Sequence, residues 1–188
     1  WLFKAPSSSL TSVSSLENWS MRGANPDGSG HVSGPSSILK GTLIKSYDLG
    51  METRSSSAIM NEVVYIGGDF NIIALDAEDG ETLWETQTNG PVHGTPAVAG
   101  GKLYLPLQDK RLLALDLDSG AIEWEFASNS PFIGSAVVDG GIVYAAAQDG
   151  QVYAVDAESG REIWNVDVGS SVVQLPSVHR GKVVVGSS

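Results

Sequence analysis

The chain contains no cysteine. Disulfide bonds, thiolate catalysis and cysteine–zinc sites are therefore excluded within its 188 residues. Basic residues are also few, because 11 Lys and Arg stand against 22 Asp and Glu, which gives a formal net charge of −11. Proteins that bind nucleic acids or anionic membranes usually carry a basic surface patch. We therefore expect neither as a partner.

Long apolar runs and helical periodicity are missing as well. No run approaches the roughly 18 consecutive apolar residues of a membrane-spanning helix, so no transmembrane segment is expected. No window has apolar residues at i, i+3, i+4 and i+7, the pattern of an amphipathic helix. The 22 glycines and 41% hydrophobic residues instead favour many short strands joined by tight turns around one core.

What the chain does contain is an internal repeat. Residues 74–84 read Ala-Leu-Asp-Ala-Glu-Asp-Gly-Glu-Thr-Leu-Trp, and the pattern Ala-x-Asp-x-x-x-Gly-x-x-x-Trp returns twice at an interval of 40 residues. Four residue types that keep one interval indicate a repeat architecture. The positions of this repeat motif are Ala74, Asp76, Gly80, Trp84, Ala114, Asp116, Gly120, Trp124, Ala154, Asp156, Gly160 and Trp164.

Each copy predicts four short strands. In the second copy these are residues 95–99, 102–107, 111–116 and 122–126. The pair Gly100-Gly101 between the first two strands supplies the positive φ angles that a two-residue hairpin requires. The turn before the last strand begins at Asp116, whose carboxylate can accept bonds from the following backbone N–H groups. All strands of a copy are thus expected to pair antiparallel in one sheet.

The strands are apolar on both faces, as the run Leu112, Leu113, Ala114 and Leu115 illustrates. A sheet with one face in water would alternate apolar and polar residues. Tight hairpins leave no covering helices, so neighbouring copies must cover one another. Four-stranded sheets stacked in this way form a β-propeller, whose blades of about 40 to 45 residues match the interval.

The repeat motif has a physical explanation in such a fold. The Gly adopts the left-handed conformation that closes the hairpin, and the small Ala lets an adjacent sheet approach. The Trp fills the wedge between blades, where an indole buries roughly 150–250 Å². We read the Asp-x-x-x-Gly segments as capped hairpin turns rather than calcium loops, because no distal bidentate Glu follows them.

Three prolines fall within expected strands. Pro96 and Pro176 lie in the first strand of their copies, where a missing N–H is tolerated only at a sheet edge. This favours a first strand that lines a central channel. Pro106 lies in a second strand, where we expect a β-bulge.

The repeat motif, with Gly-x-Val-Tyr-like strands before it, resembles the repeat of the pyrroloquinoline-quinone-type (PQQ-like) propeller family. Residues 19–23, Trp-Ser-Met-Arg-Gly, are similar to the Trp-x-x-x-Arg-Gly opening found in that family. The resemblance covers residues 19–188 and implies an all-β propeller of four-stranded antiparallel blades. The family contains quinoprotein dehydrogenases and also non-catalytic scaffolds of bacterial outer-membrane assembly. It implies an extracytoplasmic location, whether periplasmic, secreted or surface-anchored.

The chain divides into three expected parts. A Ser-rich arm is followed by an irregular segment dense in turn formers and then by the propeller repeats. Extrapolation of the interval places Ile44 at a Trp position, so the repeats begin with the closing strand of another blade. The expected boundaries are 1–18, 19–42 and 43–188, with the closing strand at 43–49, complete copies at 51–90, 91–130 and 131–170, and a partial copy at 171–188.

Three complete blades with partial blades at both ends amount to about half of a seven- or eight-bladed ring, which needs about 280–320 residues. Such a stack presents apolar blade faces at its two ends. A longer parent chain, a homo-oligomer that completes the ring, or a protein partner that caps it would each cover those faces. We favour the longer chain.

Catalytic residues are not evident. His31, His93 and His179 share no metal-ligand spacing, and the paired Cys and the haem-binding Cys-x-x-Cys-His of many quinoprotein dehydrogenases do not occur. We therefore predict no catalytic, cofactor or metal site. The resemblance favours a protein–protein interaction scaffold in a cell-envelope assembly. The alternatives are the N-terminal half of a quinoprotein dehydrogenase that binds PQQ with calcium, and a ligand-sensing propeller domain.

Overall fold

The computed structural model describes residues 2–4, 42–132, 134–172, 176–179 and 181–186. All sixteen regular elements in these ranges are β-strands. They form three four-stranded antiparallel sheets and two two-stranded sheets. The all-β propeller with partial blades predicted from the sequence is confirmed in its architecture. Within the described ranges, no helix has the length and apolarity that a membrane crossing requires.

The three four-stranded sheets are the complete blades, and each pairs its strands in chain order. The first blade consists of β3 (Ala58–Met60), β4 (Val63–Gly67), β5 (Asn71–Asp76) and β6 (Thr82–Gln87). The second consists of β7 (Ala97–Ala99), β8 (Lys102–Pro106), β9 (Arg111–Asp116) and β10 (Ile122–Ala127). The third consists of β11 (Val137–Asp139), β12 (Ile142–Ala146), β13 (Gln151–Asp156) and β14 (Glu162–Asp167).

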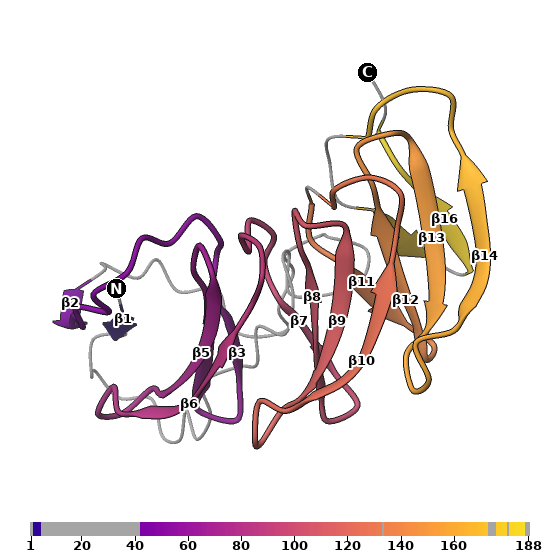
Figure 1. Cartoon of the computed structure of the whole chain (residues 1–188). Coiled ribbons are helices and arrows are strands. Elements are labelled where there is room, and N and C mark those ends of the chain that lie inside the picture. Colours follow the sequence, from indigo (N-terminus) through magenta and orange to yellow (C-terminus); the bar gives the residue numbers. More distant parts are fainter. Residues whose placement is uncertain (1, 5–41, 133, 173–175, 180, 187–188) are drawn as a thin grey trace.

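A two-stranded sheet lies at each end of the row of blades (Figure 1). On one side β1 (Leu2–Lys4) pairs with β2 (Thr42–Lys45). On the other β15 (Ser177–His179) pairs with β16 (Lys182–Val184). Apart from these strands, the expected arm 1–18 and irregular segment 19–42 lie outside the described residues. The strand expected over 43–49 is shorter and ends at Lys45.

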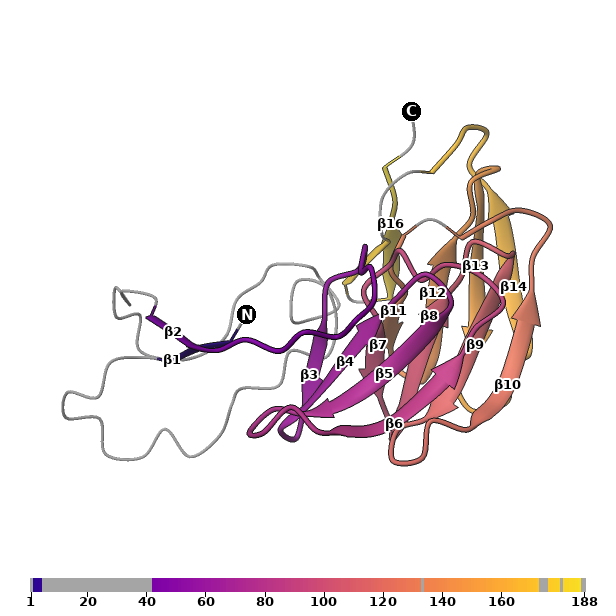
Figure 2. The same ribbon diagram turned by 60° about the vertical axis from the view of Figure 1, so that its left-hand side comes forward.

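The blades are arranged side by side with their first strands adjacent. Strand β7 contacts both β3 and β11, and β11 also contacts β15. The second view shows the same fan of sheets, with the fourth strands of the blades along its outer side (Figure 2). First strands that meet while fourth strands diverge are the geometry of a propeller around an axis. The described blades cover only part of such a ring.

Two hydrophobic clusters lie between the blades. Leu103, Leu105 and Leu113 of the second blade pack with Tyr65 and Ile72 of the first. The opposite face of the second blade packs against the third in the same way. The run 112–115 is fully buried, which agrees with strands that are covered on both faces.

The hairpin turns follow the residues that the sequence supplies. Gly100 and Gly101 have φ angles of 60° and 76° between β7 and β8, as a primed two-residue turn requires. At the equivalent turn of the first blade Asn61 and Glu62 take positive φ without glycine. Glu62 is a conformationally costly choice at such a position, because its Cβ crowds the backbone.

The prolines differ from expectation. Pro96 and Pro176 precede β7 and β15 instead of lying inside them. Pro106 ends β8 opposite Leu112 with no shift in register, so the expected bulge is wrong. The N–H of Leu107 donates to Arg111 O, so the neighbouring Pro106 nitrogen points away from β9. The Pro106 nitrogen faces the side of the sheet on which β7 lies. Because the pairing of β7 with β8 ends at Tyr104, no hydrogen bond of the ladder is lost at Pro106.

Candidate interaction surfaces

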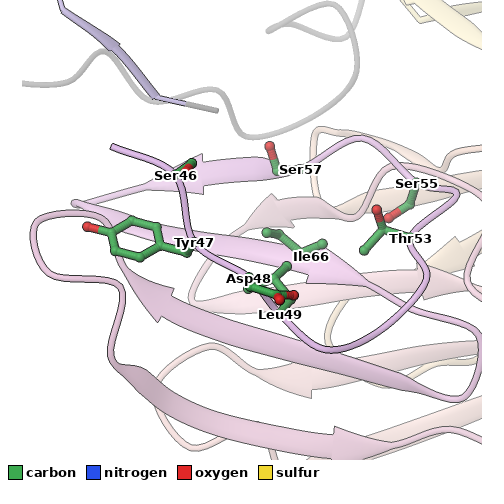
Figure 3. Close-up of a pocket in the computed structure, with 8 residues that line it drawn as sticks. All are labelled: Ser46, Tyr47, Asp48, Leu49, Thr53, Ser55, Ser57 and Ile66. Atoms are coloured by element: carbon green, nitrogen blue, oxygen red, sulfur yellow. The ribbon is translucent and has the colours of Figure 1, made fainter. Parts of the chain in front are cut away.

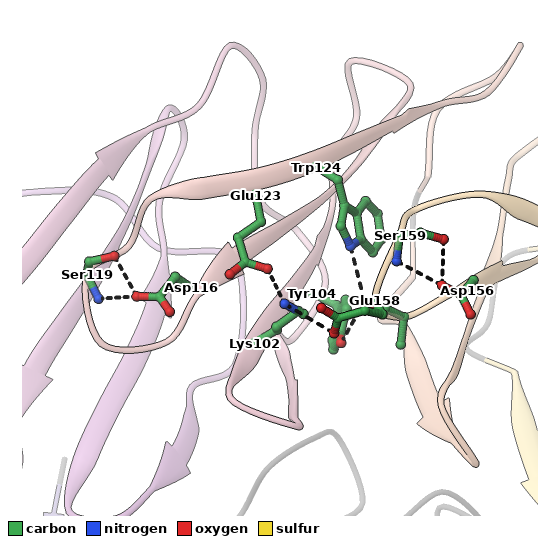
Figure 4. Close-up of polar contacts among 10 residues, drawn as sticks. Lys102, Tyr104, Asp116, Ser119, Glu123, Trp124, Asp156, Glu158 and Ser159 are labelled. Atoms are coloured by element: carbon green, nitrogen blue, oxygen red, sulfur yellow. Dashed lines mark hydrogen bonds and ion pairs between the residues drawn. The ribbon is translucent and has the colours of Figure 1, made fainter.

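The Asp of the repeat motif organises the turn between the third and fourth strands (Figure 4). Asp116 Oδ1 accepts bonds from the backbone N–H of Ser119 at 2.8 Å and from its hydroxyl at 2.5 Å. Asp156 and Ser159 repeat this contact at 2.8 and 2.6 Å. Bonds from the serine hydroxyl and backbone lower the pKa of both carboxyl groups. These acids stay ionised as turn acceptors.

The Trp and the Gly of the motif meet between neighbouring blades. A Cβ added to Gly120 would lie 2.4 Å from a ring carbon of Trp84, and one added to Gly160 would lie 2.7 Å from Trp124. The indole N–H of Trp84 donates to Leu117 O of the next blade at 3.0 Å. Each indole is half-buried and covers the turn of the following blade, so the 40-residue interval reflects a contact between blades.

The Ala of the motif lies between two aromatic rings of its own blade. Ala114 is paired with Tyr104 on one side and with Trp124 on the other. The two ring centroids are 5.9 Å apart, and the corresponding distances in the first and third blades are 5.8 and 6.0 Å. A larger residue at this position would separate the rings. The Tyr is therefore part of the motif, a role that the sequence interval alone did not reveal.

A different aromatic residue covers the turn of the first blade. The Tyr47 ring lies over Gly80, where an added Cβ would approach it to 2.3 Å. Its hydroxyl donates to Glu78 O at 3.1 Å. The 40-residue interval places Ile44 at the Trp position of this partial copy, whereas the residue that lies over Gly80 is Tyr47. Tyr47 does not keep the repeat interval, so only the fold identifies it.

An ion pair links the second blade to the third. Lys102 is almost fully buried, and its ammonium group bonds to Glu123 of the same blade. It also lies 3.4 Å from a carboxylate oxygen of Glu158 in the next blade (Figure 4). The bond to Glu123 is the main reason that the pKa of Lys102 is raised. This cluster strengthens contact between the blades and has no substrate-facing geometry.

The hairpin between β4 and β5 presents an exposed aromatic residue. Phe70 at its tip is 59% exposed. Arg54 lies beside this hairpin, with its Nε 3.9 Å from Asp69 Oδ1 and its Nη2 3.9 Å from Glu52 Oε2. We name these four residues the Phe70 rim. Aromatic and Arg side chains that stay accessible are the residue types enriched at protein-binding hot spots.

The two histidines in the described part of the chain, His93 and His179, belong to no metal-binding group. His93 Nδ1 lies 2.7 Å from the Gln108 amide nitrogen, whereas His179 is exposed on β15. His31 lies outside the described residues. In the described part of the chain, no three His, Asp or Glu side chains gather in a metal-binding arrangement.

A polar cavity of about 430 Å³ lies against the first blade (Figure 3). Its walls come from the segment after β2 and from the apolar side chain of Ile66 in β4. Ile66 belongs to the face of the first blade that points away from the second. The lining residues are Ser46, Tyr47, Asp48, Leu49, Thr53, Ser55, Ser57 and Ile66. Hydroxyl groups dominate, and no pair of these side chains has an acid–base or nucleophile geometry.

The repeated sheets and the Trp-on-Gly contacts define a β-propeller of the PQQ-like class. The chain belongs to the PQQ-like propeller family: the family model described as "Outer membrane protein assembly factor BamB" matches residues 19–133 and 127–188. No sequence among curated proteins matches the chain.

Solved structures share the fold at low identity. BamB from Moraxella catarrhalis matches with a TM-score of 0.69 and 22% identity, over 75% of this chain and 49% of that chain. A quinohemoprotein alcohol dehydrogenase from Comamonas testosteroni matches with a TM-score of 0.67 and 20% identity. The match covers 79% of this chain and 27% of the dehydrogenase chain. The computationally designed protein Ika4 matches with a TM-score of 0.70 and 17% identity. The match covers 80% of this chain and 94% of the Ika4 chain. This chain thus spans about half the length of the BamB chain.

Proposed function

We propose that this chain is a non-catalytic scaffold for protein–protein interaction in a cell-envelope assembly. The observation that carries the proposal is the family match, because a model described as an outer-membrane assembly factor covers residues 19–188 in two overlapping segments. An extracytoplasmic location, with a protein partner and without a cofactor, belongs to the same proposal.

The Phe70 rim is the surface that we assign to the partner. Phe70 combines a large apolar area with a position at a hairpin tip, and Arg54 beside it can pair with a carboxylate of the partner. The chain has a net charge of −11, so an exposed Arg flanked by acids gives local selectivity rather than a broad electrostatic attraction. Aromatic residues, Phe among them, and Arg are enriched in protein–protein interfaces.

The experiment is affinity capture from an envelope extract with wild-type chain and with Phe70→Ala. A partner that uses this rim should be lost or bind about tenfold more weakly to the variant, the effect of removing one hot-spot residue. Leu83→Ala is the matched control, because Leu83 is 52% exposed on the outer strand of the same blade. Equal retention by both variants contradicts the assignment of the rim.

Addition of PQQ and calcium to the purified chain distinguishes the scaffold from the dehydrogenase. The scaffold predicts neither a bound-quinone absorbance nor dye-linked alcohol oxidation. Either signal would favour the N-terminal half of a quinoprotein dehydrogenase, and specific binding of another small molecule would favour a ligand-sensing domain.

A further inference from the structure

Each complete blade ends in a fourth strand whose outer edge pairs with no strand of the described residues. These strands, β6, β10 and β14, lie along the outer side of the row of blades (Figure 2). An unpaired edge is a template for another strand, and proteins usually guard it with charged side chains, proline or a bulge. All three edges share a bulge beside the motif Trp, and none contains proline. What distinguishes them is how the charge of their acidic side chains is compensated.

The backbone of β10 is free along the regular part of its outer edge. The N–H of Ser128 donates to Lys110 O at 2.8 Å, and alternate residues of an antiparallel strand bond to the same neighbour. Phe126 therefore bonds to β9, whereas the backbone N–H and C=O groups of Glu125 and Ala127 point to the free edge. An added strand can pair with all of these groups.

Both acidic side chains of β10 are held by cations of the inner strands. Glu123 bonds to Lys102 of β8 (Figure 4). Glu125 Oε2 lies 3.1 Å from Arg111 Nη1 of β9. Because the two cations lie inward of β10, they draw the carboxylates back over their own blade and compensate their charge. The charges that normally guard an edge strand are thereby weakened in the second blade.

The other two edges keep acidic side chains without a cation. In β6, Glu85 accepts hydrogen bonds from the neutral amides of Asn71 and Gln87 at 2.9 and 2.8 Å. The acids of β14 are Glu162 and Asp167. Within the described residues, no ion pair involves any of these three carboxylates. The edge of β10 is therefore the least guarded of the three.

We propose that the free edge of β10 binds an extended, basic segment of another protein, which adds a strand to the second blade by β-augmentation. Each cation behind β10 also contacts a second acid, Glu158 or Asp109, so the surroundings of the edge stay negative. A Lys or Arg of the segment opposite Glu125 adds a favourable cross-strand pair. The net charge of −11 attracts such a segment and speeds its association.

A second copy of the chain fits this edge less well. Antiparallel pairing of two β10 edges about Glu125 places the two Glu125 carboxylates opposite each other, and like charges in that position destabilise a sheet. The charge of −11 on each copy also opposes their approach. The inference concerns the middle one of the three complete blades. It depends neither on the Phe70 rim nor on the proposed function.

Amide hydrogen exchange of the isotope-labelled chain, followed by NMR, tests the pairing. The probe is a short capped peptide of alternating Lys and Val. Exchange at Glu125 and Ala127 should slow about fivefold once the peptide reaches about four times its Kd, because only unbound chain exchanges. No slowing at up to about 10 mM peptide, a concentration that half-saturates even a Kd of that size, would overturn the proposal. Equal slowing at Glu85 and Gln87 would overturn the choice of β10.

Proline at the edge provides the matched variants. Ala127→Pro removes an N–H that points to the free edge and leaves the ladder to β9 intact. It should raise the Kd of the peptide about fivefold or more, because a hydrogen bond of the added strand is lost. Gln87→Pro makes the same change at the equivalent position of β6 and should leave the Kd unchanged. Equal effects of the two variants contradict the proposal, and circular dichroism checks that both stay folded.

The charge of the probe tests the chemistry of the partner. A peptide with Glu in place of Lys should bind about tenfold more weakly at low salt, and added salt should reduce the difference. Equal binding of the two peptides would contradict a basic segment. Sedimentation velocity of the free chain tests the alternative occupant: a dimer that Ala127→Pro dissociates would assign the edge to a second copy and overturn the proposal.

Discussion

At the residue scale, contacts between aromatic rings and small residues hold neighbouring blades together. Tyr104 and Trp124 meet over Ala114 within one blade, and both Tyr104 Oη and Trp124 Nε1 donate to Ala157 O of the next, at 3.2 and 3.1 Å. One carbonyl thus receives two donors from the neighbouring blade. The contact depends on a protonated phenol, because a phenolate cannot donate.

The phenols make stability fall in alkaline solution. Burial, as the largest cause, raises the pKa of Tyr65 and of Tyr104 from 10.0 to about 12. The folded state holds these protons more tightly than the unfolded state, so the stability they contribute is present below pH 10 and is lost as pH rises toward 12. Chemical denaturation across this range should show the decrease. Tyr104→Phe should make the decrease smaller without abolishing it, because Tyr65 still titrates. It should cost about 1 kcal/mol at neutral pH, since Trp124 still satisfies Ala157 O.

The sequence predicted the residues that keep the 40-residue interval, and it did not reveal those that depend on three-dimensional contact. Trp84 and Gly120 are recognisable because both recur. Tyr47 occurs once, at a different offset, and its contact with Gly80 arises from how the chain passes from β2 to the first blade. A contact that is not repeated leaves no period in the sequence.

At the element scale, one position on the second strand and one on the fourth strand change together from blade to blade, either both charged or both apolar. Lys102 and Glu123 form an ion pair in the second blade. The third blade has Ile142 and Ile163 at the positions 40 residues later. The equivalent positions of the first blade, Val63 and Leu83, are also apolar.

An apolar pair should therefore replace the ion pair. The double substitution Lys102→Ile with Glu123→Ile is expected to leave the free energy of unfolding unchanged within about 1 kcal/mol, as seen when buried ion pairs are exchanged for packed hydrophobic residues. Glu123→Ile alone should cost about 1–3 kcal/mol, because Lys102 stays buried with only the solvent-exposed carboxylate of Glu158, at 3.4 Å, as its partner. Urea denaturation of the wild-type chain and of these two variants measures the difference. A double variant less stable than the single one would contradict the argument.

Turn chemistry and two-face hydrophobicity were sufficient to predict the strand positions of the complete blades, because Gly-Gly pairs and apolar runs act locally. The boundaries near proline were less predictable. Pro106 fits at the end of β8 because β7 is only three residues long, and strand length depends on how the inner strands crowd around the axis. The three-residue β1 carries no periodic signal at all.

At the scale of the whole molecule, the described blades form part of a ring with a half-blade at each end. The contact is the same at the two junctions between complete blades: Trp84 covers Gly120, and Trp124 covers Gly160. This common contact fixes the angle between neighbouring sheets. The account of the fold depends on this contact.

A double-mutant cycle of Trp124→Ala and Gly160→Ala, followed by denaturant unfolding, tests this contact most directly. Trp124→Ala should cost about 2–4 kcal/mol because the indole is half-buried. Gly160→Ala should cost more than the 1–2 kcal/mol of a left-handed Ala, since the new methyl group meets the indole at 2.7 Å. With the indole removed this clash disappears, so we predict a coupling energy of about 1 kcal/mol or more. Additivity within about 0.5 kcal/mol would contradict blades that stack by Trp on Gly.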